Sequence, residues 1–223
     1  CLLENLNSEE GAIVASRRVV VTGLGLVTPV GNTVPETWEA LCNGRSGIGP
    51  MTEFDVSALP TRIAGEIRDF DITQFVSAKE ARRFDKFMHY GLGAAQEAMA
   101  QAGIDGPDHG VDPDRVGFAV GAGIGGIASI EENMLIYRDK GPRRVSPFYI
   151  PGSIVNMISG FLSIKYGFKG PNIAVVTACT TSTHNIGIAA RMIQYGDADL
   201  MVAGGSEYGT TPTAMAGFTS AKA

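Results

Sequence analysis

The sequence has little of what several large protein classes require. Its 223 residues include only three cysteines, Cys1, Cys42 and Cys179, which are widely spaced and odd in number. That arrangement fits neither a disulfide framework nor a zinc site, so it predicts a reducing, cytoplasmic setting and no metal. Lys and Arg total 18 against 23 Asp and Glu, a net charge of −5. There is no basic excess for binding nucleic acid.

Long apolar runs are also missing. None approaches the roughly 20 residues that a membrane-spanning helix needs, and residues 1–16 lack the basic start and apolar stretch of a signal peptide. No membrane association is predicted. Residues 1–16 are predicted to be a loosely ordered extension and residues 17–223 one domain. Because the chain starts at Cys1 and stops at Ala223 inside an unfinished element, we expect a fragment of a longer protein.

The sequence does contain an alternation of predicted strands and helices. Apolar runs typical of buried strands cover residues 18–22, 116–120, 173–176 and 199–203. Predicted helices begin at Asn32 or Thr33 and then cover residues 77–102, 127–139, 153–166 and 182–195. Ser77 and Glu80 form a capping-box pattern, and Gly103, Gly167 and Gly196 follow three helix ends. This alternation predicts βαβ units, a mostly parallel sheet and an α/β fold.

Cys179 lies where the predicted strand 173–176 leads into the predicted helix 182–195. Unpaired N–H groups and the positive end of a helix dipole favour a thiolate there, and the thiolate is the form that attacks carbonyl carbon. A nucleophile is one interpretation, and a buried cysteine that acts as a small apolar side chain is the other. His184, five residues further on, is rotated roughly 140° around the helix. It is therefore a poor base for Cys179, and we predict a buried structural histidine.

The glycine run at 121–126 satisfies G-x-G-x-x-G between a predicted strand and a predicted helix, the context for dinucleotide binding. That fingerprint also requires an acidic residue about 20 positions further on. Here the position falls in the loop of Arg143 and Arg144. Nucleotide binding through Gly121–Gly126 is therefore a weaker alternative, and no cofactor is predicted. The glycines would instead allow close backbone packing beside a substrate channel.

The residues around Cys179 carry a family resemblance. The string T-A-C-T-T-S-T-H-N-I-G, followed by D-A-D-L-M-V-A-G-G-S-E, resembles the active-site region of β-ketoacyl-[acyl-carrier-protein] synthases. The opening V-V-V-T-G-L-G-L-V-T-P-V-G-N and the segments G-I-G-G, S-P-F-Y-I-P and I-V-N-M-I-S-G are similar to the same family in the same order. The similarity is closest to the type II synthases of bacterial fatty-acid elongation. One departure is Thr181-Ser182-Thr183, where those enzymes commonly have Ser-Gly-Val.

The resemblance implies a fold and a reaction. The fold would be the thiolase-like layered α/β/α/β/α sandwich, of which this chain would be the N-terminal half with part of the cap region, in a homodimer. Cys179 would accept an acyl group from acyl carrier protein as a thioester. Malonyl carrier protein would then lose carbon dioxide, and the resulting carbanion would attack that thioester. The family's two catalytic histidines and its lysine would lie beyond Ala223, so we expect these 223 residues alone to be inactive.

The resemblance also assigns roles to other residues. Ile124 and Phe218 would line the acyl pocket, and Tyr149 and Ile150 would approach the partner's pocket across the dimer. The strand 173–176 would pair with its two-fold mate. The residues that would receive the acidic carrier protein are all basic: Arg82, Arg83, Lys86, Arg143 and Arg144. The first three also share a predicted helix face with Lys79, at spacings of i, i+3, i+4 and i+7, which without the resemblance would indicate only a solvated face.

Other functions of related proteins remain as alternatives. One is a polyketide-type ketosynthase. A second is a non-catalytic chain-length partner of such an enzyme, although those partners generally lack the active-site cysteine. A third, weaker alternative is a thiolase that acts on coenzyme A thioesters.

Overall fold

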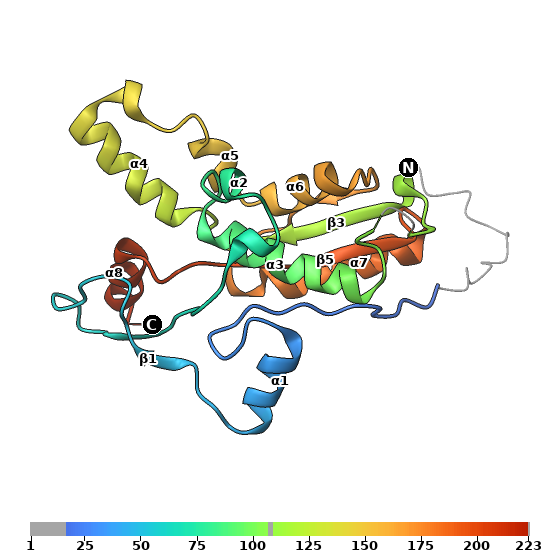
Figure 1. The fold of residues 1–223 in the computed structure, drawn as a ribbon, viewed down its shortest axis with the longest axis horizontal. Coiled ribbons are helices and arrows are strands. Elements are labelled where there is room, and N and C mark those ends of the chain that lie inside the picture. The colour runs from blue at the N-terminus through green and yellow to red at the C-terminus, as the bar shows by residue number, and fades with distance from the viewer. Residues whose placement is uncertain (1–16, 107–108, 223) are drawn as a thin grey trace, which may run out of the picture.

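The computed structural model describes residues 17–106 and 109–222, so the extension predicted for residues 1–16 lies outside the described residues. The helices are α1 (Val34–Cys42), α2 (Ala78–Ala81), α3 (Lys86–Gln101), α4 (Ile127–Lys140), α5 (Tyr149–Ser153), α6 (Met157–Tyr166), α7 (Thr181–Tyr195) and α8 (Pro212–Ser220). The strands are β1 (Ile48–Pro50), β2 (Ile63–Gly65), β3 (Val116–Gly121), β4 (Asn172–Ile173) and β5 (Leu200–Gly205) (Figure 1). Short 3₁₀ turns cover Ile72–Gln74, Pro113–Arg115, Pro142–Arg144 and Ala178–Thr180.

The central sheet is parallel, with the order β4-β3-β5. The pairing of β3 with β5 runs from Val116 opposite Leu200 to Gly121 opposite Gly205, whereas β4 pairs at only two positions. All six residues of β3 are buried, as expected for a strand covered on both faces. The helices α6 and α7 both contact β3, and α3 contacts α6 and β5. The predicted parallel α/β arrangement is confirmed.

The main core lies between α3, α6 and one face of β3. Its fully buried side chains are large and apolar, and they include Phe87, Met88, Leu92, Met99, Phe118, Ile158 and Leu162. Burying one such side chain stabilises the fold by about 1.5–3 kcal/mol. The core side chains of β3 are Val116, Phe118 and Val120, whereas the small residues alternate with them. This alternation follows from the two-residue period of a strand.

The predicted helix 77–102 is two helices. The capping box of Ser77 and Glu80 is present, but α2 ends at Ala81 and α3 begins at Lys86. Asp85 is the N-cap of α3, with an extended backbone, and its Oδ1 accepts the N–H of Phe87 at 3.2 Å. Its Oδ2 accepts the N–H of Ser129, in the first turn of α4, at 2.7 Å. One buried carboxylate therefore caps two helices, which requires the chain to leave the helical conformation at Asp85.

The predicted helix 153–166 is present as α6, which starts four residues later than expected, and the structure adds the short helix α5 before it. Ser153 ends α5, and Ile154 has an extended backbone before α6 starts at Met157. The carbonyl of Ser153 accepts the N–H of Gly126 at 2.9 Å, so α5 is fastened to the turn after β3. The end of α6 at Gly167, which has a φ of +70°, agrees with the prediction.

The prediction of a strand at residues 18–22 is wrong. Residues 17–27 are not in a strand, and Val20 and Val21 are exposed. The segment that follows packs along α3, because Leu24 donates to the Gln101 side chain at 2.6 Å and Leu26 to Glu97 at 2.9 Å. Side chains of α3 therefore provide the hydrogen bonds that a neighbouring strand would have given.

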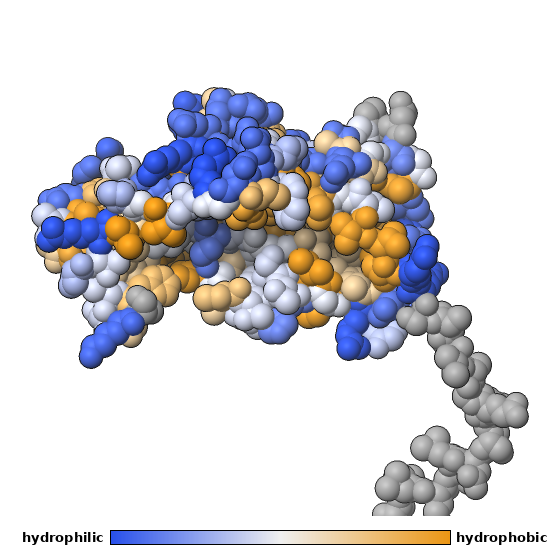
Figure 2. All heavy atoms as spheres, turned by 90° about the horizontal axis from the view of Figure 1, so that it is seen from below, coloured by the Kyte–Doolittle hydropathy of each residue, from blue (hydrophilic) through white to orange (hydrophobic). Residues whose placement is uncertain are grey.

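The structure confirms several other elements and adds a hairpin. Thr33 caps α1, β1 pairs with β2 in antiparallel register, and α4 and α7 occupy the predicted ranges to within a residue. Figure 2 shows one face of the molecule, on which apolar surface lies in several separate patches. Across residues 17–106 and 109–222, each helix is too short or too polar to cross a bilayer.

Candidate active site

Cys179 lies in the 3₁₀ turn Ala178–Thr180, immediately before α7, as the sequence predicts. The side chain is exposed, so the interpretation as a buried apolar residue is wrong. Ala178 has a φ of +54°, the left-handed region that residues with a Cβ seldom adopt. A hydrogen bond spans this turn, because the N–H of Thr177 donates to Thr181 Oγ1 at 2.9 Å. A strained backbone thus presents the thiol outward at a helix N-terminus.

His184 is exposed, and the prediction of a buried histidine is wrong. The helical rotation from Cys179 places it on a face of α7 that the described residues leave uncovered. Its Nδ1 lies 2.7 Å from Thr177 Oγ1, so the ring is engaged with a hydroxyl group. This contact agrees with the prediction that His184 is not the base for Cys179.

Asn185 holds the strand that leads to Cys179, and the sequence analysis missed it. The side chain is fully buried, accepts the N–H of Val175 at 2.9 Å and donates to the carbonyls of Val175 at 3.1 Å and Gly204 at 3.2 Å. The predicted strand 173–176 is therefore too long, because paired strand stops at Ile173 and a side-chain amide takes over the backbone bonding. A single Asn inside a helix gives no sequence signal for this role.

The glycine turn after β3 packs directly against the Cys179 turn. A Cβ on Gly123 would lie 2.8 Å from Glu207 Oε2 and 3.1 Å from the Cα of Ala178, so only glycine fits. Glu207 Oε2 accepts the N–H of Ile124 at 2.7 Å, and its Oε1 accepts the N–H of Gly125 at 3.1 Å. A carboxylate thus occupies the N–H groups that would cradle a phosphate, which argues against the nucleotide-binding alternative. The close-packing interpretation of the glycines is confirmed.

The four residues predicted to contact the acyl chain lie on three elements. Ile124 is on the glycine turn, beside the Cys179 turn, with 42% of its surface exposed. Tyr149 and Ile150 begin α5, which is fastened to the same turn through Ser153. Phe218 lies on α8 beside Gly209. The structure therefore brings Ile124 next to the Cys179 turn and places the others on neighbouring or separate elements.

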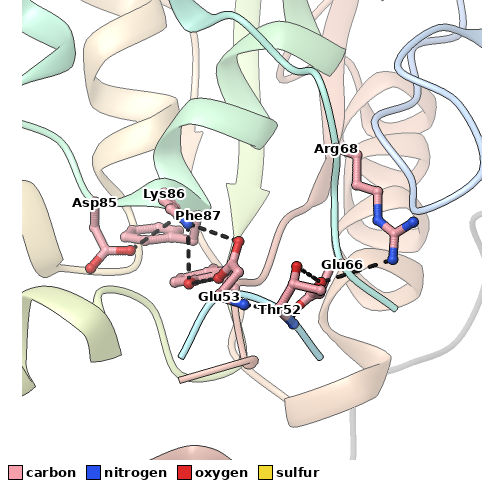
Figure 3. Close-up of polar contacts among 8 residues, drawn as sticks. Thr52, Glu53, Glu66, Arg68, Asp85, Lys86 and Phe87 are labelled. Carbon is pink, nitrogen blue, oxygen red and sulfur yellow. Dashed lines mark hydrogen bonds and ion pairs between the residues drawn. The ribbon is translucent and has the colours of Figure 1, made fainter. Parts of the chain in front are cut away.

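The five basic residues predicted to contact the carrier protein differ in how far they already bind other side chains of this protein. Lys86 donates to Glu53 at 2.9 Å and to the Tyr208 hydroxyl at 3.2 Å, and its ammonium lies over the Tyr208 ring (Figure 3). Tyr208 also donates to Glu53. Burial, followed by the hydrogen bond to Glu53, raises the pKa of Tyr208 well above its usual range. The expectation of one shared helix face is wrong, because the helix breaks between α2 and α3 and Lys86 binds inward.

The other four basic residues are more accessible. The guanidinium of Arg83 stacks over the Phe148 ring at 4.2 Å. The remaining three, Arg82, Arg143 and Arg144, are exposed. Arg143 and Arg144 follow α4 in a 3₁₀ turn. In the part of the chain that the structure describes, no three His, Cys, Asp or Glu side chains gather as a metal site.

Comparison with known proteins decides the family. Residues 16–223 match the sequence model described as "Beta-ketoacyl synthase, N-terminal domain". The chain belongs to the β-ketoacyl synthase family. It is 52% identical, over 94% of its length, to 3-oxoacyl-[acyl-carrier-protein] synthase 2 of Vibrio harveyi, and 45% identical, over 93%, to the synthase of that name from Staphylococcus aureus strain N315. The chain spans about half the length of these relatives.

Solved structures of β-ketoacyl synthases agree with this assignment. A β-ketoacyl synthase from Burkholderia phymatum STM815 gives a TM-score of 0.77 at 26% identity, over 92% of this chain and 50% of that one. A type II polyketide ketosynthase, solved in complex with its acyl carrier protein, gives 0.77 at 26% identity, over 92% of this chain and 55% of that one. The predicted thiolase-like α/β fold is confirmed.

Proposed function

We propose that the protein is a β-ketoacyl-[acyl-carrier-protein] synthase of fatty-acid elongation with Cys179 as its nucleophile. The observation that carries this proposal is the exposed thiol on a strained turn at the N-terminus of α7, in a chain of this family. Relatives with about half of their residues identical are named 3-oxoacyl-[acyl-carrier-protein] synthase 2. An exposed cysteine at a helix N-terminus is suited to attack on a thioester.

The proposed reaction has two steps at one sulfur atom. Cys179 Sγ attacks the acyl thioester carbonyl, a new C–S bond forms, and the carrier's thiolate leaves. Malonyl carrier protein then loses carbon dioxide, and its carbanion attacks the acyl-cysteine carbonyl, which releases the β-ketoacyl product and frees Cys179. In this proposal the backbone N–H of Cys179 donates to the oxyanion in each step. Among the described residues, no imidazole or ammonium group is hydrogen-bonded to Cys179 Sγ, and His184 is engaged with Thr177 instead. We therefore expect no turnover by these 223 residues alone.

The binding roles form part of the same proposal. Ile124 and Phe218 line the acyl pocket, and Tyr149 and Ile150 approach the acyl pocket of a second copy of the protein across a homodimer. The open cations Arg82, Arg143 and Arg144 receive the acidic carrier protein, while Arg83 and Lys86 contribute after partial release from Phe148 and Glu53. A local positive patch on a chain of net charge −5 would steer such a partner. The cytoplasm is the proposed location, as the cysteine usage predicts.

A polyketide-type ketosynthase is the second candidate. One of the similar solved structures, the type II polyketide ketosynthase described above, comes from that class. The 52% identity with fatty-acid synthases favours elongation. Cys179 argues against a non-catalytic chain-length partner.

The test is condensation by the whole gene product that contains this sequence. Purified protein is given acyl and malonyl carrier protein, and the β-ketoacyl product is measured for the wild type, Cys179→Ala and the control Cys42→Ala, which removes the other described cysteine. We expect product from the wild type and from C42A and none from C179A. Faster reaction with coenzyme A thioesters would indicate a thiolase instead. Product from C179A would contradict the proposal.

A further inference from the structure

Glu207 joins two segments that are far apart in the sequence, the segment after β5 and the glycine turn after β3. It lies two residues after the end of β5, and its two carboxylate oxygens each accept one backbone N–H of the glycine turn, from Ile124 and Gly125. We call this arrangement the Glu207 clip. Hydrogen bonds to a carboxylate are about twice as strong as those between neutral groups. The clip therefore fixes the backbone of the glycine turn at Ile124 and Gly125.

The turn that the clip holds is flexible by composition but anchored on its other side. Gly125 has a φ of +87°, and Gly126 donates to the Ser153 carbonyl at 2.9 Å. Without the clip, the turn remains attached to α5 while Ile124 is free to move about Gly125. Glu207 also lines an open groove of about 190 Å³ together with Leu26. Gln has nearly the same size as Glu, so the Glu207→Gln substitution changes the hydrogen bonding rather than the volume of the side chain.

The side chain that the clip places is apolar and adjoins the nucleophile. A Cβ on Gly123, the residue before Ile124, would lie 3.1 Å from the Cα of Ala178, the residue before Cys179, so the two turns pack closely. Ile124 keeps 42% of its surface exposed, so an apolar side chain reaches the surface from the turn that packs against the Cys179 turn. If Ile124 contacts the acyl chain, as proposed above, a small shift of the glycine turn changes the length of acyl chain that fits beside it.

We propose that Glu207 is a positioning residue that sets, through Ile124, which acyl chain lengths Cys179 accepts. This inference rests on the proposed function. Replacing the carboxylate by an amide puts an N–H₂ donor against a backbone N–H donor, so Glu207→Gln keeps one of the two bonds at most. Ile124 then loses its fixed position, whereas the chemistry at Cys179 is unchanged.

The experiment measures acylation of Cys179 in the whole gene product by butyryl and lauroyl carrier protein, as kcat/KM for each. We expect Glu207→Gln to change the ratio of the two values by about tenfold, the effect of altering an apolar pocket by one methylene. Glu97→Gln is the matched control, because Glu97 also holds two backbone N–H groups, of Leu26 and Val34, with one oxygen each. It should leave the ratio unchanged.

A double-mutant cycle with Ile124→Ala makes the outcome specific. In the I124A background, Glu207→Gln should no longer change the ratio, because the side chain that the clip positions is gone. An equal fall for both chain lengths in E207Q, or the same ratio change with and without Ile124, would overturn the inference. If E207Q does not fold, Glu207→Asp serves in the same cycle. Absence of acylation in the wild type would instead overturn the proposed function.

Discussion

The core between α3, α6 and β3 and the turns around Cys179 are held together in different ways. In the core, large apolar side chains such as Phe118 and Leu92 are fully buried, and regular backbone pairing satisfies the strand. Around Cys179 that pairing ends, and single polar side chains take over: Asn185 for the strand before Cys179 and Glu207 for the glycine turn. The stability of the core therefore depends on how well its apolar side chains fill the interior, whereas the geometry of the site depends on a few hydrogen bonds. Small polar changes can move the site without unfolding the core.

Acidic side chains perform the same task in several places away from the site. Each one accepts backbone N–H groups from a segment distant in the sequence: Glu66 from Thr52 and Glu53, Asp85 from Ser129, Glu97 from Leu26 and Val34, and Glu131 from Thr213. These carboxylates satisfy loop and helix-end N–H groups that secondary structure leaves unpaired. Some of the excess acidic side chains thus act as hydrogen-bond acceptors for backbone N–H groups of the same protein.

The largest expected effect lies in the core. Phe118→Ala should lower the free energy of unfolding by about 3–5 kcal/mol, because it leaves a cavity in a fully buried part of the sheet. Lys79→Ala, at an exposed position in α2, should change it by less than about 0.5 kcal/mol. Urea denaturation of the whole gene product measures both. Similar values for the two variants would show that the apolar core does not dominate stability.

The next effect separates stability from site geometry. Asn185→Ala should cost about 2–3 kcal/mol, because it leaves backbone groups of Val175 and Gly204 without a partner. It should also change the rate at which iodoacetamide alkylates Cys179.

Asn133→Ala is the matched control for that experiment. Asn133 is also a buried amide, and it bridges Ser129 and Ser146 on α4 and the loop after it. It should destabilise the protein to a comparable extent and leave the alkylation rate unchanged. If both variants change that rate equally, Asn185 has no particular role at the site.

The smallest expected effect is a pH dependence at Glu66. Burial alone would raise the pKa of Glu66, but hydrogen bonds from Thr52 and Glu53, together with Arg68, lower it below its ordinary value of 4.5. A carboxyl whose pKa is lower in the folded state stabilises the fold above pH 4.5, and that contribution is lost as the pH falls through the folded-state pKa. Glu66→Gln should cost about 1–2 kcal/mol at neutral pH.

Thermal unfolding of the wild type and E66Q across the acidic range measures this effect. The difference in stability between the two proteins should be largest above pH 4.5 and should shrink below it. A difference that grows on acidification would contradict the assignment of a lowered pKa to Glu66.

Local patterns were sufficient to predict much of the architecture. The apolar run of β3, the glycines that end α6 and α7, and the position of Cys179 before a helix are all properties of short segments. The errors have distant causes. The helix break at Asp85 depends on Ser129, and the extended segment at 17–27 depends on Glu97 and Gln101 of α3.

The site shows the same division. Cys179 stands out in the sequence because of its setting, but neither Asn185 nor Glu207 carries a local signal for what it holds. The exposure of His184 depends on which elements cover that face of α7, and five residues of spacing cannot specify this. Local sequence patterns therefore do not predict the polar contacts between distant segments of this protein.

The central claim is that Cys179 carries the acyl group, and mass spectrometry tests it directly. The whole gene product is incubated with acyl carrier protein without malonyl carrier protein, digested, and the peptides that contain Cys42 and Cys179 are weighed. The account predicts that the mass of the Cys179 peptide increases by one acyl group and that the Cys42 peptide is unmodified. Condensation by a protein whose Cys179 peptide never carries the acyl group would contradict it.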